Sequence, residues 1–195
     1  MTNGIDVSYA QGAINWPQVV TDFVYIKLNT GVDDEDSWVK PNSYQSRAKN
    51  IPLGYYHFAT LNSSDVVTDA KNEAEDTLTD LFNLPKYDQR LPPVLDIEQQ
   101  NTLAIPPADI ELWISTYVAA MAAEGHKTVL YSYPYWLNSN LLPTHKLGTL
   151  PLWIAQYGVS SPTIPVGWAN YWMWQYGQGR VAGINTQVDL NKINS

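Results

Sequence analysis

Two carboxylates flank a single isoleucine in the stretch "PPVLDIEQQ", residues 92–100, directly after an apolar run. Side chains of a β-strand alternate between its two faces, so in a strand Asp96 and Glu98 share one face, with Cα atoms roughly 7 Å apart. Like charges held that close resist ionising together, which separates two carboxyl groups into a proton donor and an anion. The pair is therefore a candidate for acid catalysis, which the rest of the chain must support. The structural alternative is that either acid caps a helix or pairs with a lysine.

Eight short segments of the chain are typical of strands, and most are continuous apolar runs, as expected for strands covered on both faces. They are residues 4–8, 23–29, 52–59, 92–98, 128–133, 151–157 and 171–176, with a weaker segment at 187–191. Residues 63–84 and 106–124 carry apolar side chains at helical spacing. This alternation favours the α/β class with a parallel sheet, and eight strands favour a closed β/α barrel of the TIM type.

The intervals between predicted strands shorten after residue 134 and are rich in Pro, Gly, Ser and Asn. They leave little room for long helices, so we expect an irregular barrel with fewer helices in its C-terminal part. No linker or internal repeat interrupts the sequence. We therefore expect residues 1–195 to form a single domain.

Reactive residues of β/α barrels gather at the C-terminal ends of the strands. Asp6 ends the first predicted strand and Asp189 lies in the last, and these strands are neighbours if the barrel closes. Both acids would then join Asp96 and Glu98 at one mouth. Four carboxylates there suit either acid cleavage of a glycosidic bond or binding of Ca²⁺ or Mg²⁺.

Aromatic side chains at the other strand ends favour a sugar polymer as the ligand, because its C–H faces stack on rings while its hydroxyl groups bond to acids. These residues are Tyr56, Tyr131, Trp153, Tyr157, Trp174 and Tyr176.

Seven motifs appear in a fixed order over almost the whole chain: "GIDVSYAQGAINW", "VYIKLNTG", "GYYHFA", "VLDIE", "PLWIAQY", "MWQYGQG" and "VDLN". Together they resemble the family 25 glycoside hydrolases, the Chalaropsis-type lysozymes of bacteria, phages and some fungi. The resemblance implies a flattened β/α barrel. It also implies an endolysin-like, bacteriolytic muramidase that cleaves the β-1,4 bond between N-acetylmuramic acid and N-acetylglucosamine in peptidoglycan.

By the same resemblance, Glu98 corresponds to the general acid and Asp96 to its partner carboxylate. Asp96 would stabilise a positively charged intermediate or orient the acetamide of the substrate, and the sequence does not choose between these roles. Asp6 and Asp189 match the other acidic positions of the family. Further motif positions expected near the sugar are Tyr56, Trp153, Gln156, Trp174 and Gln175, and His57 also falls in a motif, where a structural role is equally open.

One position departs from the family pattern. Many relatives carry a glutamate before the glycine that follows the second strand, where this chain has Thr30. Threonine can form hydrogen bonds but carries no charge. The nearby acids at 33–36 are expected to form a solvated loop rather than to replace that glutamate.

Three other functions remain open at this point. A chitinase of family 18 would need acids at Leu91 and Val94 to complete Asp-x-x-Asp-x-Asp-x-Glu, and half of that pattern is absent. A barrel that binds cell-wall glycan without cutting it has no need of a buried acid pair. A metal-dependent hydrolase would use the four carboxylates as an oxygen cage.

Composition limits the partners. The chain has no cysteine, and its three histidines lack metal-ligand spacing, so we expect neither a bound metal nor another cofactor. A net charge of −8 disfavours nucleic acid and anionic membranes. No stretch approaches the roughly 18 apolar residues of a membrane span, and the N-terminus has no signal-sequence pattern. We expect a monomer that acts at the bacterial cell wall, released as phage lysins are or trimmed from a secreted precursor.

Overall fold

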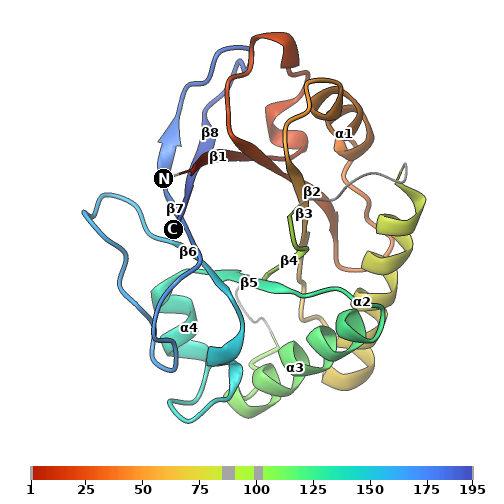
Figure 1. Cartoon of the computed structure of the whole chain (residues 1–195). Coiled ribbons are helices and arrows are strands. Elements are labelled where there is room, and N and C mark those ends of the chain that lie inside the picture. The colour runs from red at the N-terminus through yellow and green to blue at the C-terminus, as the bar shows by residue number, and fades with distance from the viewer. Residues whose placement is uncertain (1, 85–90, 99–102, 195) are drawn as a thin grey trace.

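The computed structural model describes residues 2–84, 91–98 and 103–194, so Gln99 and Gln100 of the opening stretch lie outside the described residues. Its strands form a closed barrel in chain order, which Figure 1 shows along the barrel axis. The strands are β1 (Thr2–Val7), β2 (Phe23–Thr30), β3 (Leu53–Phe58), β4 (Val94–Asp96), β5 (Val129–Ser132), β6 (Leu152–Ala155), β7 (Met173–Gly179) and β8 (Val188–Ile193). The predicted eight-stranded β/α barrel is confirmed.

The last strand runs in the opposite direction to the others. Strands β1 to β7 pair in parallel, whereas β8 is antiparallel to both β7 and β1. The expectation of an all-parallel sheet is therefore wrong for this strand. Only residues 180–187 join β7 to β8, and a parallel crossover needs a dozen or more.

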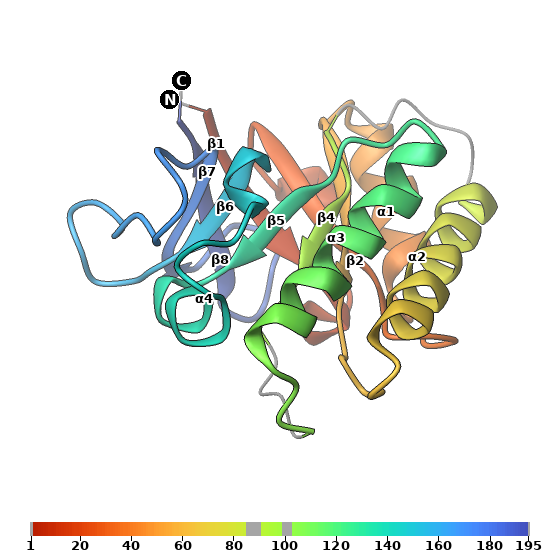
Figure 2. The ribbon, with the colours of Figure 1, turned by 90° about the horizontal axis from the view of Figure 1, so that it is seen from below.

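The helices are α1 (Val39–Ala48), α2 (Val66–Asn83), α3 (Pro107–Ala123) and the short α4 (Pro134–Asn140), with 3-10 turns at Tyr9–Gln11, Trp16–Gln18 and Leu147–Thr149. Both predicted helices are present as α2 and α3. Asp65 caps α2 by accepting a hydrogen bond from the Thr68 amide at 3.2 Å. Figures 1 and 2 show α1, α2 and α3 against the β2–β5 side of the barrel, while no α-helix is assigned within the described residues that follow α4.

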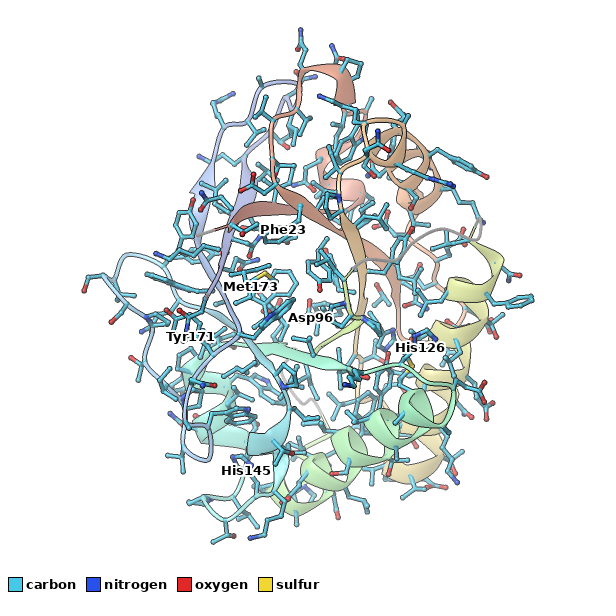
Figure 3. The ribbon with its side chains drawn as sticks, in the orientation of Figure 1. Phe23, Asp96, His126, His145, Tyr171 and Met173 are labelled. Carbon is cyan, nitrogen blue, oxygen red and sulfur yellow. The ribbon has the colours of Figure 1, made fainter. Side chains whose placement is uncertain are left out.

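Apolar side chains fill the inside of the barrel below its mouth. Figure 3 shows Phe23 and Met173 within the ring of strands, together with Asp96. The inner cluster consists of Phe23, Tyr25, Val94, Val129, Tyr131, Trp153, Ala155 and Met173. Alternate residues of the same strands point outward and pack against the helices and the surrounding chain. The barrel is therefore a packed scaffold that supports the residues at the C-terminal ends of its parallel strands.

Candidate active site

The two carboxylates of the opening stretch lie together at the end of β4. Asp96 is the last residue of the strand, and Glu98 follows it by two positions. The Ile97 amide donates to the Tyr131 carbonyl at 3.0 Å, which keeps the backbone extended beyond the assigned strand. Ile97 is fully buried in the outer cluster, whereas Asp96 and Glu98 both line a cavity of about 210 Å³. The alternation predicted from the sequence therefore holds.

The cavity collects most of the predicted site residues. Besides the acid pair, it is lined by Asp6, Ser8, Tyr9, Ala10, Lys27, Tyr56, Phe58, Tyr131, Trp153, Gln175 and Asp189. All four predicted carboxylates are in this group. So are four of the six predicted sugar-binding residues, namely Tyr56, Tyr131, Trp153 and Gln175.

Asp6 and Asp189 face each other across the seam where β1 meets β8. They are direct partners in the antiparallel register, so their side chains lie on the same face of the sheet. Asp6 is only 7% exposed, and its Oδ2 accepts hydrogen bonds from Asn191 Nδ2 at 2.7 Å and Gln175 Nε2 at 3.0 Å. Burial and the charge of Asp189 nevertheless raise the pKa of Asp6 to about 7.

Gln175 connects the acids to the tyrosines. Its Nε2 donates to Asp6, which directs its Oε1 toward the Tyr131 hydroxyl at 2.9 Å and the Tyr157 hydroxyl at 2.6 Å. The Tyr157 hydroxyl also lies 2.9 Å from Asp189 Oδ1. One amide thus holds the two sides of the cavity in a continuous hydrogen-bond network.

The Asp96–Glu98 pair lies in an environment that opposes full ionisation. Burial raises the pKa of both groups; the charge of Glu98 raises that of Asp96 further, and the charge of Asp189 raises that of Glu98. The positive charge of Lys27 lowers the pKa of both groups and so partly offsets these effects. Asp96 is 6% exposed, and its Oδ1 has no hydrogen-bond partner among the described residues. This oxygen is an acceptor available to a bound molecule.

Lys27 was not predicted from the sequence. Among the described residues that line the cavity it is the one cation, and its Nζ lies 4.8 Å from the centre of the Phe58 ring and 5.9 Å from that of Tyr9. A usable signal was present, because Lys27 interrupts the apolar run "FVYIKLN" two residues after the inward-facing Tyr25.

Asn191 was missed as well. It accepts a hydrogen bond from Trp153 Nε1 at 3.0 Å while donating to Asp6. It therefore fixes both the indole at the base of the cavity and the acid at the seam. Residues 187–191 have only a weak strand pattern, so the sequence did not predict that Asn191 faces the inside of the barrel.

Two predicted sugar-binding residues do not line the cavity. Trp174 packs in the outer cluster, where its Nε1 donates to the Gln156 carbonyl at 2.8 Å and Lys192 Nζ lies 4.1 Å above its ring. The side chain of Gln156 accepts a hydrogen bond from the Thr163 amide at 2.6 Å. Strand alternation explains the position of Trp174, since its neighbour Gln175 points inward.

The acidic loop after β2 is only partly solvated. Asp33, Asp34 and Glu35 are exposed, as expected, but Asp36 is buried. Asp36 accepts hydrogen bonds from the backbone amides of Tyr9 at 2.9 Å and Trp38 at 2.8 Å. Its inclusion in a solvated loop was wrong, and Asp36 instead anchors the 3-10 turn that carries Tyr9 over the cavity.

In residues 2–84, 91–98 and 103–194, no cluster of three or more histidine, aspartate or glutamate side chains is arranged to hold a metal ion. Within the same described residues, no helix is long and apolar enough to cross a membrane.

The chain is similar to known lysozymes along nearly its whole length. It is 33% identical to Lysozyme M1 of Streptomyces globisporus over 201 aligned positions, covering 98% of this chain and 67% of that protein. It is 30% identical to the autolytic lysozyme of Clostridium acetobutylicum, covering 98% of this chain and 55% of that protein. The crystal structure of the bacterial lysozyme from Streptomyces coelicolor superposes with a TM-score of 0.87 at 32% identity, covering 100% of this chain and 92% of that one.

The family comparison agrees with these relatives. Residues 5–184 match the model of the glycosyl hydrolases family 25, which spans most of the barrel and includes Asp6, Asp96 and Glu98. The chain belongs to glycosyl hydrolase family 25.

Proposed function

We propose that this barrel is a lysozyme that hydrolyses the β-1,4 bond between N-acetylmuramic acid and N-acetylglucosamine in bacterial peptidoglycan. The observation that carries the proposal is the buried acid pair Asp96 and Glu98 in a cavity whose walls include Tyr56, Tyr131 and Trp153. The similar proteins described above support it, because they are lysozymes. The chain spans about half of the autolytic lysozyme and two thirds of Lysozyme M1, so the proposal concerns this domain.

Glu98 acts as the general acid in this proposal. It is half-buried, and burial together with the charge of Asp189 raises its pKa. A raised pKa keeps a carboxyl group protonated to higher pH, and in that form it can protonate the glycosidic oxygen as the bond breaks. Such proton transfer typically accelerates a reaction by a factor of about 10² to 10⁴.

Asp96 acts as the partner anion. In the free cavity burial and the charge of Glu98 raise the pKa of Asp96, and its Oδ1 receives no hydrogen bond from the described residues. A substrate N–H or hydroxyl group that donates to Oδ1 stabilises the ionised form. The proton of the pair then rests on Glu98, and the Asp96 anion either stabilises positive charge at the sugar or orients the acetamide group.

The remaining cavity residues hold the sugar and the charges in place. Gln175 donates to Asp6, Asp189 is joined to Gln175 through the Tyr157 hydroxyl group, and Asn191, behind the cavity wall, fixes the indole of Trp153. Preorganised groups of this kind contribute to catalysis because they need little reorganisation as charge develops. No bound cofactor takes part in the proposed reaction.

The proposed place of action is the bacterial cell wall, with peptidoglycan glycan strands as the partner and a monomer as the working form. Neither nucleic acid nor a membrane is part of the proposal, since a net charge of −8 opposes both.

The test is a digest of purified peptidoglycan, with new reducing ends identified by mass spectrometry. Wild-type protein is expected to release ends of N-acetylmuramic acid. Glu98→Gln keeps the shape of the side chain but removes its proton, so it should reduce the rate by about 10² to 10⁴. Glu75→Gln, which changes an exposed glutamate of α2, is the matched control and should keep the wild-type rate.

Three outcomes would contradict the proposal. Ends of N-acetylglucosamine would place the cut at the other bond, and a near-normal rate for Glu98→Gln would remove the assignment of the acid. No new ends from any variant, with glycan still bound, would indicate a cell-wall glycan-binding barrel instead.

A further inference from the structure

A chain of buried polar side chains lies behind the wall that β2 and β3 form. His57 of β3 is 1% exposed; its Nδ1 lies 2.8 Å from Asn29 Oδ1 and its Nε2 lies 2.7 Å from Glu73 Oε2. Asn29 of β2 and Glu73 of α2 are equally buried, at 0% and 1%. The cluster therefore joins two barrel strands to a helix without reaching the cavity.

The neighbouring donors fix which atoms of Asn29 and Glu73 face His57. Asn29 Nδ2 donates to Asp76 at 3.0 Å and Asp80 at 2.8 Å, so its Oδ1 must face the histidine as an acceptor. Glu73 accepts from both the amide and the hydroxyl group of Thr60, so it too faces the histidine as an acceptor. Both ring nitrogens of His57 therefore lie against oxygen acceptors, Nδ1 against Asn29 and Nε2 against Glu73.

The same cluster lies where β2 departs from regular pairing. Lys27 pairs with Tyr56 and Asn29 pairs with His57, so one extra residue is inserted in β2 at this point. Without the insertion, Lys27 and Asn29 would point to the same face. With it, Lys27 lines the cavity while Leu28 and Asn29 both face outward, Leu28 into the outer cluster and Asn29 to His57.

We propose that His57 is a positioning residue for Lys27. Lys27 faces inward by ordinary alternation from Tyr25, and His57, held between Asn29 and Glu73, fixes the bulge of β2 that begins directly after Lys27 and turns Asn29 outward. Phe58, the residue after His57, carries the ring on which the Lys27 ammonium group lies. This clamp of Asn29, His57 and Glu73 thus holds the backbone directly after Lys27 and the Phe58 ring on which the Lys27 ammonium group lies.

The consequence for the reaction rests on the proposed function. Lys27 lowers the pKa of both Asp96 and Glu98. Loss of its position should therefore move both limbs of the pH–rate profile to higher pH, rather than reduce the rate at a fixed optimum. A residue with a purely structural role would change stability or the height of the profile without moving its limbs.

The primary test needs no substrate. The carboxyl titrations of Asp96 and Glu98 would be followed by ¹³C NMR in wild type, Lys27→Met, His57→Gln and the double variant. Lys27→Met should move both midpoints to higher pH, and His57→Gln should move them in the same direction. The double variant should move them no further than Lys27→Met alone, because His57 acts through Lys27. The pH–rate profiles are expected to shift in parallel.

Two further variants keep the test decisive. Glu73→Gln weakens the contact with His57 Nε2 while preserving the shape of the side chain, so it should cause a smaller shift in the same direction. Tyr117→Phe is the matched control: it removes a buried hydrogen bond to Thr77 at 3.1 Å, and its ring stacks on His57 at 5.3 Å. This control should lower the melting temperature without moving either midpoint.

Unmoved midpoints in folded His57→Gln would overturn the proposal. So would a shift in the double variant that exceeds the shift of Lys27→Met, since His57 would then act independently of the lysine. Failure of the proposed function is a separate result. It would appear as a lack of reducing ends from the wild type, while the NMR midpoints would still report on the clamp.

Discussion

Asp6 combines a buried position with a second carboxylate as its partner across the barrel seam. Its pKa is raised from 3.8 to about 7, first by burial and then by the charge of Asp189. The folded protein therefore holds this proton more tightly than the unfolded chain does. The stabilisation that results is complete below about pH 4, and it is lost as the pH rises through about 7.

Asp6→Asn should remove that pH dependence. One pKa unit corresponds to about 1.4 kcal/mol, so the contribution of Asp6 can reach about 4 kcal/mol across this interval. The wild-type free energy of unfolding should fall between pH 5 and pH 8 by more than that of Asp6→Asn, as measured by urea denaturation at the two values. Equal falls for both proteins would mean that Asp6 is not the titrating group.

Among single residues, the sequence predicted those whose placement depends on local alternation. Asp96 and Glu98 needed only an extended backbone to share a face. Lys27 shares the inner face with Tyr25 by the same alternation, whereas the bulge that turns Asn29 outward to His57 is a feature that no local pattern reveals. Trp174 was placed beside Gln175 at the cleft by resemblance, although adjacent residues of a strand point to opposite faces.

At the scale of elements, the floor of the cavity depends on a glycine in β3. A Cβ atom on Gly54 would lie 2.4 Å from the ring of Tyr25 and 2.9 Å from Leu91 Cβ. Tyr25 in turn packs on Trp153 with ring centres 4.9 Å apart. Strand β3 can therefore pack this closely against Tyr25 only because position 54 is a glycine.

Gly54→Ala should destabilise the protein by about 1–3 kcal/mol, the usual cost of overpacking a core. It should also reduce kcat/KM, since displacement of Tyr25 moves Trp153 at the base of the cavity. Gly177→Ala in β7 is the matched control, because a Cβ atom there meets nothing within 4 Å. Urea denaturation and the peptidoglycan digest would measure both effects. Similar stabilities for the two variants would contradict the prediction.

The elements themselves were predictable to different degrees. Strands with apolar runs, and the helices α2 and α3 with apolar stripes, carried clear local signals. Helix α1 did not, because it buries the polar residues Asn42, Ser43 and Ser46 beside Val39. The direction of β8 could not be predicted from its own residues either. It follows from the connection between β7 and β8, which is too short for a parallel crossover.

At the scale of the whole molecule, net charge should govern the approach to the wall. At −8 the protein is repelled by cell walls that carry anionic polymers. Raising ionic strength from about 0.01 M to about 0.1 M shortens the screening length from about 30 Å to about 10 Å. Lysis of such cells should therefore become faster over this range, whereas cleavage of purified, polymer-free peptidoglycan should change little. Lysis rates that are flat or fall with added salt would contradict this expectation.

The reversed last strand also decides where the chain can be extended. Thr2 pairs with Ile193, so both ends of the barrel sequence emerge side by side, as Figure 2 shows, at the pole away from the mouth that Asp6 and Asp189 line. A parallel β8 would have delivered the C-terminal end to the rim of the cavity instead. With β8 antiparallel, a tether or fusion partner attached at either end would extend from the face of the barrel opposite the cavity. A short linker could even join the two ends and let the chain be opened elsewhere, with the entrance for the glycan strand left clear.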